Sequence, residues 1–131
     1  MTVAHWCVLI AALLPYVATG IAKWPSFGRR RADGGYDNND PRGWLSRQTG
    51  LQARANAAQM NTFEALPFFI GAVLLAHQLH APQQRVDALA VAFIACRVIY
   101  IALYVADKAT LRTLCWMAGM AANVALFLSG V

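Results

Sequence analysis

The sequence predicts an all-α integral membrane protein: a four-helix bundle that forms one transmembrane domain over residues 1–131. Hydrophobic residues make up 59% of the chain and charged residues only 13%, whereas average soluble domains carry about 25% charged residues. Four stretches are long and apolar enough for a helix to cross the hydrocarbon core, which takes about 20 residues. The expected helices cover about residues 1–22, 51–80, 86–106 and 111–129. A polar connector of about residues 23–50 separates the first two.

The first apolar stretch contains no charged side chain. A cleaved signal peptide is the alternative interpretation, but such a peptide normally carries positive charge before its apolar core. Here the first basic residue, Lys23, follows the core. We therefore expect a helix that is retained in the mature protein.

The connector is rich in Gly and Pro, which is typical of a surface loop. It holds most of the basic residues, namely Lys23, Arg29, Arg30, Arg31, Arg42 and Arg47. Such a cluster can bind nucleic acid, but between two membrane spans it is better explained by the excess of Lys and Arg in cytoplasmic loops. The third connector adds Lys108, whereas the second offers only Arg85. We expect a cytoplasmic connector, both termini on the non-cytoplasmic side, and no nucleic-acid partner.

The cysteines and histidines do not predict a metal site. Cys7, Cys96 and Cys115 lie in apolar stretches without C-x-x-C spacing. His77 and His80 are three residues apart and could bind a metal ion. The better interpretation is that they are polar side chains at the membrane interface. The chain also lacks the loop and helix motifs of nucleotide-binding proteins, serine hydrolases and zinc proteases.

Three of the expected helices carry polar side chains within the membrane. At about 100° per residue, each set falls on one face of its helix. The sets are Arg54, Asn61 and Glu64; Arg97, Tyr100 and Tyr104; and Arg112, Trp116 and Asn123. Such residues usually face the bundle interior and have a partner there. A pocket rich in Arg and Tyr suits an anionic ligand.

The depths of the two central charges match. Glu64 lies about ten residues below Arg54, and Arg97 lies about ten residues before Asp107, so both are about 15 Å deep. We predict a Glu64–Arg97 ion pair, with a polar funnel that opens to the cytoplasm above it. The pair could instead serve only to neutralise charge and set the helix register, and Arg54 could simply extend to the interface.

The run from Arg54 to Pro67 resembles the second-helix signature of the MAPEG family, the membrane-associated proteins in eicosanoid and glutathione metabolism. The family pattern is an upstream Arg, then Asn-x-x-Glu, then a Pro three residues after the Glu. Asn61, Glu64 and Pro67 match that spacing. Two further segments resemble the family's third helix and the start of its fourth: Arg97 with Tyr100 and Tyr104, and residues 108–113.

The resemblance implies a homotrimer that binds glutathione between subunits at the cytoplasmic end. It implies a glutathione-dependent transferase or peroxidase that acts on a hydrophobic small molecule dissolved in the bilayer. Arg112 would be the catalytic residue that stabilises the glutathione thiolate. The residues that would bind glutathione are Arg54, Asn61, Glu64, Arg97, Tyr100, Tyr104 and Thr113.

The chain also departs from the family pattern. Ala57 stands where the synthases have a second Arg, and Ala65 stands where an aromatic residue is frequent. Each loss removes a partner for glutathione. The alternative is therefore a non-catalytic membrane scaffold, or a protein that binds anionic lipid through its arginines. A proton-coupled transporter that uses Glu64 is a third possibility, but the four helices show no internal repeat.

Overall fold

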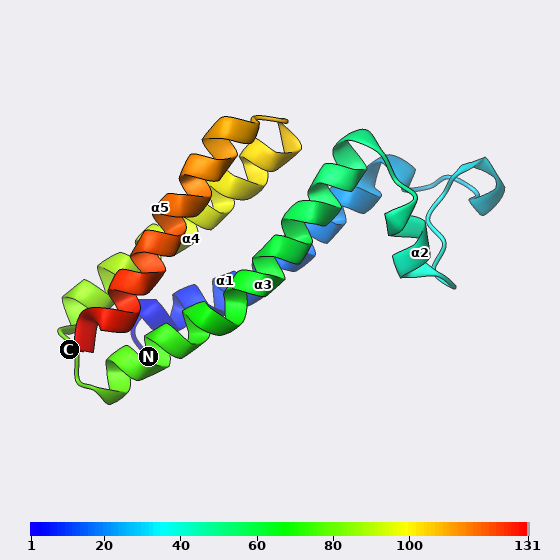
Figure 1. Ribbon diagram of the computed structural model, residues 1–131. Coiled ribbons are helices and arrows are strands. Elements are labelled where there is room, and N and C mark those ends of the chain that lie inside the picture. Colours follow the sequence, from blue (N-terminus) through cyan, green and yellow to red (C-terminus); the bar gives the residue numbers. More distant parts are fainter. Residues whose placement is uncertain (131) are drawn as a thin grey trace.

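A computed structural model describes residues 1–130 and contains four helices long and apolar enough to cross a membrane. Figure 1 shows them as two antiparallel pairs. Their ends lie within three residues of those expected from the apolar stretches. The four helices are α1 (Val3–Lys23), α3 (Gly50–Gln78), α4 (Gln83–Val105) and α5 (Ala109–Phe127).

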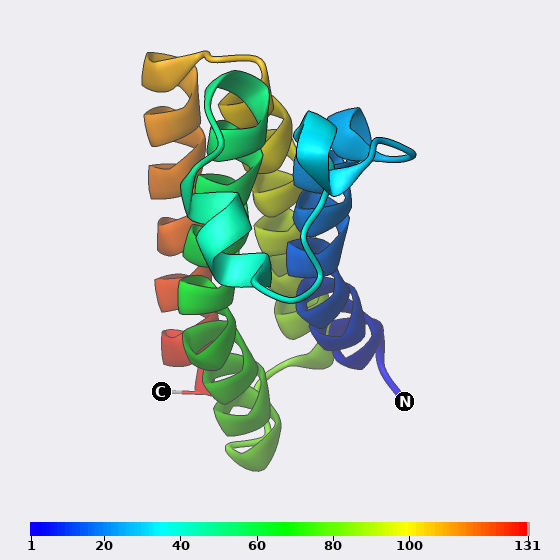
Figure 2. The ribbon, with the colours of Figure 1, turned by 90° about the vertical axis from the view of Figure 1, so that its right-hand side faces the viewer.

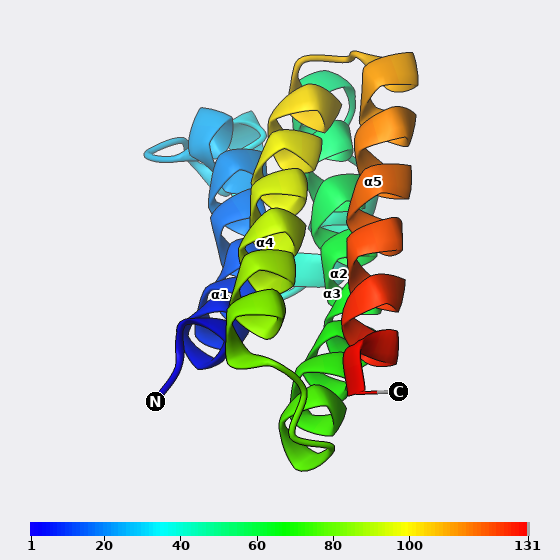
Figure 3. The same ribbon diagram turned by 90° about the vertical axis from the view of Figure 1, so that its left-hand side faces the viewer.

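The start of α1 and the end of α5 lie at one end of the bundle, as Figures 1 and 3 show. The connector between α1 and α3 lies at the opposite end, together with the α4–α5 turn. We call these the terminal end and the connector end. With 29 residues, α3 is about 43 Å long at 1.5 Å per residue, which exceeds the hydrocarbon core of about 30 Å.

Small residues let the helices approach closely, as is common between membrane helices. Ala4, Ala72 and Ala90 are fully buried in the core that α1, α3 and α4 share. Phe69 and Phe93 stack at its centre, with their ring centroids 4.2 Å apart. Between α4 and α5, a Cβ atom at Gly119 would lie only 3.2 Å from that of Cys96, so the glycine lets these helices pack more closely than most residues would.

The connector is more ordered than the expected loop, and that part of the prediction needs correction. It contains two short 3-10 turns, η1 (Trp24–Ser26) and η2 (Arg31–Asp33), and a helix, α2 (Pro41–Ser46). The Gly and Pro residues of the connector predicted a loop because these residue types interrupt long helices. Helical segments of three to six residues can still form between them.

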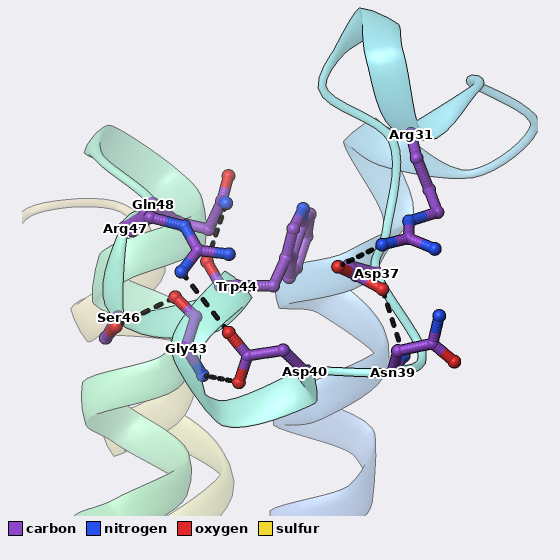
Figure 4. Close-up of polar contacts among 9 residues, drawn as sticks. All are labelled: Arg31, Asp37, Asn39, Asp40, Gly43, Trp44, Ser46, Arg47 and Gln48. Carbon is purple, nitrogen blue, oxygen red and sulfur yellow. Dashed lines mark hydrogen bonds and ion pairs between the residues drawn. The ribbon is translucent and has the colours of Figure 1, made fainter.

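Local capping explains the position of α2, as Figure 4 shows. Asp40 is the N-cap and accepts a hydrogen bond from the backbone N–H of Gly43 at 3.0 Å. Pro41 occupies the first turn, where its missing N–H is no loss. Trp44 is buried and packs edge-on against Tyr36, with the ring centroids 5.1 Å apart. This contact anchors α2 to the rest of the connector.

Candidate functional site

An open pocket of about 180 Å³ lies toward the connector end, where α3, α4 and α5 meet. On α4, Tyr100 and Tyr104 are one turn apart and therefore share a face. On α5, the contributing residues lie in the first two turns. The pocket is lined by Asn61, Tyr100, Tyr104, Arg112, Thr113 and Trp116.

Two guanidinium groups flank two tyrosine rings along this site. The Arg97 guanidinium carbon lies 4.5 Å from the centroid of the Tyr100 ring. The rings of Tyr100 and Tyr104 meet edge to face with centroids 5.5 Å apart. The guanidinium carbon of Arg112 lies 4.1 Å from the Tyr104 ring. These cation–π contacts hold the two arginines in defined positions.

Arg112 makes no ion pair and no side-chain hydrogen bond with residues 1–130. It also lies near the N-terminus of α5, where the helix dipole disfavours positive charge. Helix stability therefore does not explain this arginine. Its guanidinium is free to bind an anion in the pocket.

Arg97 lies behind the pocket and is only 3% exposed. Its guanidinium donates hydrogen bonds to Asn61 Oδ1 at 3.0 Å and to Thr62 Oγ1 at 3.2 Å. Its Nε atom has no partner among the described residues. Both hydrogen-bond acceptors are neutral, so the positive charge of Arg97 is held in the bundle without a carboxylate in direct contact.

The predicted Glu64–Arg97 ion pair is wrong. Glu64 is exposed and accepts a hydrogen bond from Asn61 Nδ2 at 3.4 Å, so Asn61 stands between the two charges. The buried face of α3 runs through Thr62, which lies about 160° around the helix from Glu64. Matching depth was therefore not enough, because the two side chains leave α3 and α4 in different directions.

Arg54 does not line the pocket either. Its Nε atom donates a hydrogen bond to the carbonyl oxygen of Val105 at 3.2 Å, and its Nη1 lies 3.8 Å from Asp107 Oδ2. Val105 is the last residue of α4. Arg54 thus places a positive charge where the helix dipole favours it and ties α3 to the end of α4.

Five of the eight predicted site residues line one pocket: Asn61, Tyr100, Tyr104, Arg112 and Thr113. Arg97 supports it from behind, whereas Arg54 and Glu64 lie outside it. Trp116 lines the pocket but was not predicted as a site residue. The signal for Trp116 was its position one helical turn after Arg112, which places the two side chains on the same face.

The histidines lie at the terminal end. The rings of His5 and His77 stack with centroids 4.5 Å apart, and His80 is exposed in the turn that follows α3. Residues 1–130 contain no group of three or more His, Cys, Asp or Glu side chains arranged to hold a metal ion.

The model of the MAPEG family matches residues 3–131, which is essentially the whole chain. No curated protein and no solved structure matches. With four membrane-spanning helices and a family match along its length, this chain is an integral multi-pass membrane protein that belongs to the MAPEG family.

Proposed function

We propose that this protein is a membrane-embedded, glutathione-dependent transferase or peroxidase that acts on hydrophobic electrophiles. The observation that carries the proposal is Arg112, whose guanidinium is stacked on Tyr104 beside an open pocket and has no ion-pair or hydrogen-bond partner among residues 1–130. Glutathione carries two carboxylates and a thiol that can ionise. An arginine without an ion-pair partner can bind either a carboxylate or the thiolate.

The chemistry follows from the need to ionise the thiol. A thiol is a poor nucleophile until it loses its proton, and a nearby guanidinium favours the thiolate. The thiolate sulfur then bonds to the electrophilic carbon, and the leaving group departs with its electron pair and takes up a proton. With a hydroperoxide, two glutathione molecules are oxidised to their disulfide while the peroxide is reduced to an alcohol and water. Arg112 would be catalytic in both reactions.

The other pocket residues would position the tripeptide. Tyr104 and Thr113 carry hydroxyl groups in the same pocket as Arg112, and Asn61 lines the pocket from α3. Arg97 is a positioning residue, because it holds Asn61 by a hydrogen bond and Tyr100 by its cation–π contact.

The site is completed by a neighbouring subunit in a homotrimer. The single-chain pocket of about 180 Å³ is smaller than typical ligand sites, which occupy about 300–1,000 Å³. Glu64 supports the same conclusion, because it is exposed at the middle of α3. A carboxylate that faces lipid at this depth is costly, whereas a neighbouring subunit would cover it.

The connector lies in the cytoplasm in this proposal, and both termini lie on the other side. Six basic residues, from Lys23 to Arg47, support this orientation, against the single Arg85 at the start of α4. The pocket would then open toward cytoplasmic glutathione, while the hydrophobic substrate arrives from the bilayer.

Calorimetry on the full chain in detergent tests the proposal, together with the ultraviolet absorbance of the thiolate. Saturable binding of glutathione and a thiolate signal are expected for the wild type. Arg112→Ala should lose the thiolate signal. Arg112→Lys should recover only part of it, because lysine keeps the charge but cannot stack as a plane on Tyr104.

Arg85→Ala is the matched control, since it removes the same charge from an exposed position in the first turn of α4, at the terminal end. Its binding and thiolate signal should equal those of the wild type. Absence of wild-type binding at millimolar glutathione would contradict the proposal. An undiminished thiolate signal in Arg112→Ala would contradict the role of that residue.

A further inference from the structure

Two of the three cysteines face each other across α4 and α5, which run side by side in Figures 2 and 3. The Cys115 thiol donates a hydrogen bond to the backbone carbonyl oxygen of Cys96 at 3.2 Å, and the two thiol groups are also within hydrogen-bonding reach of each other. Both residues are half-buried, and both are free thiols. Cys7 lies apart from this pair, in the second turn of α1 at the terminal end.

The packing of α4 on α5 suits a covalent link at this level. Cysteines joined by a disulfide have Cβ atoms about 3.5–4.5 Å apart. A Cβ atom at Gly119 would lie 3.2 Å from that of Cys96, and Cys115 precedes Gly119 by one turn on the same face of α5. The two helices therefore approach to disulfide distance beside Cys96, and the Cys115 sulfur already contacts the Cys96 backbone.

The cysteine pair borders the pocket around Arg112 without lining it. Tyr100, which follows Cys96 by one helical turn, lines the pocket, and so does Trp116, which follows Cys115 directly. Cys115 packs against the apolar cluster that contains Tyr100. A hydrophobic molecule that enters the pocket from the bilayer would therefore arrive next to Cys115. Because both cysteines belong to one subunit, their contact does not depend on a neighbouring subunit.

Arg97 places a positive charge beside the pair. It follows Cys96 in the chain, is buried, and interacts electrostatically with both thiols. Its hydrogen bonds go to the neutral side chains of Asn61 and Thr62, so its charge can offset part of the cost of a thiolate between the helices. The thiolate is the form of cysteine that reacts with oxidants.

We propose that Cys96 and Cys115 form a redox-active pair that reduces organic hydroperoxides dissolved in the bilayer and is itself oxidised to a disulfide. The Cys115 sulfur bonds to the terminal peroxide oxygen, the O–O bond breaks, and the alcohol departs with the thiol proton, which leaves a sulfenic acid. The Cys96 sulfur then bonds to the Cys115 sulfur, and the sulfenic oxygen departs as water with the Cys96 proton. Two molecules of a small thiol restore both cysteines by exchange and leave as their own disulfide.

Intact mass spectrometry and peptide mapping under non-reducing conditions test this inference on the full chain in detergent. The reduced protein is treated with cumene hydroperoxide in the absence of glutathione, so the result does not depend on the proposed glutathione site. The wild type should lose two hydrogen atoms and give a peptide that links Cys96 to Cys115, and dithiothreitol should reverse both changes. Cys7→Ala is the matched control, because it removes the cysteine outside the pair, and it should form the link as fully as the wild type.

The serine variants assign the two roles. In Cys96→Ser the sulfenic acid of Cys115 has no resolving thiol, so it should accumulate and be trapped by dimedone. Cys115→Ser should lose both the link and the trapped adduct. Hydrogen peroxide at the same concentration should oxidise the wild type more slowly than cumene hydroperoxide, because it partitions into water rather than into the micelle.

Three results would overturn the pair: a wild type that keeps both hydrogen atoms, oxygen addition without a link, and a link that includes Cys7 or joins two subunits. Equal dimedone trapping in the two serine variants would overturn the assignment of Cys115 as the attacking thiol. Equal rates with the two peroxides would overturn the assignment of a hydrophobic substrate.

Discussion

The two ends of the bundle use polar side chains in opposite ways. At the terminal end, Asp87 of α4 accepts hydrogen bonds from the backbone N–H of Ala4 at 2.8 Å and from the side chain of Gln83 at 2.9 Å. These groups satisfy one another and close the N-terminus of α1. At the connector end, Arg112 has a defined position but no polar partner among residues 1–130. Satisfied polar groups stabilise the fold, whereas an unsatisfied one in an open pocket is available for a ligand.

The sharpest test of this comparison is Arg112→Ala. We expect the rate of glutathione conjugation to fall about 100-fold, the usual effect of losing one group that stabilises developing negative charge. The free energy of unfolding should change by less than about 0.5 kcal/mol, because the loss of the cation–π contact with Tyr104 is offset by removal of a positive charge from the N-terminal end of α5. Enzyme assays and thermal unfolding in detergent measure the two effects. A marked loss of stability would show that Arg112 is structural.

Asp87→Ala should show the opposite behaviour. It leaves the N–H of Ala4 without its acceptor, so the free energy of unfolding should fall by about 2 kcal/mol. Glutathione binding should be unchanged at temperatures where the protein stays folded. Asp87→Asn is the control, because its carbonyl oxygen keeps one acceptor and should retain much of the stability. Chemical unfolding in mixed micelles provides the measurement, and equal stability of all three proteins would refute the proposed capping role.

Arg54→Ala tests whether every arginine at the connector end takes part in ligand binding. Because Arg54 bonds to the carbonyl oxygen of Val105 and lies near Asp107, we expect a loss of about 1 kcal/mol in unfolding free energy. Calorimetry should show wild-type affinity for glutathione. Arg54→Lys, which keeps the charge, should recover part of the stability. Loss of glutathione binding in Arg54→Ala would instead extend the site to the end of α4.

The smallest effect is expected for Arg47→Ala. Both side chains of its ion pair with Asp40 are exposed. Such pairs contribute less than about 1 kcal/mol to the free energy of unfolding. The thermal unfolding midpoint should be almost unchanged, because Asp40 still caps α2 through Gly43. A large decrease would mean that the ion pair, rather than the cap, holds α2 in place.

The long helices were predictable because membrane solvation imposes a simple rule. Every backbone polar group in the hydrocarbon region must be bonded within the span, so an apolar stretch of sufficient length becomes a helix. The break at residues 107–108 and the Pro and Gly residues of the connector marked where helices end. Helix α2 was missed because only six residues form it, and the contact of Trp44 with Tyr36 that anchors it joins separate parts of the connector.

The candidate site was predictable in part, for a related reason. Helical spacing placed Tyr100 with Tyr104, and Arg112 with Trp116, on shared faces. The same spacing grouped Asn61 with Glu64, although only Asn61 lines the pocket. A helical arc shows which side chains are neighbours on one helix, but not how that helix is turned toward its partners.

The sequence by itself determined the membrane location, the four spans and the family, because these depend on hydrophobic length and on local spacing along single helices. Only the tertiary structure decided which polar groups are partners. Arg97 bonds to Asn61 and Thr62 rather than to Glu64, Arg54 bonds to the end of α4, and Arg112 remains unpaired. The physical reason is that a hydrogen bond forms over about 3 Å, and rotation of one packed helix by a fraction of a turn moves a side chain farther than that.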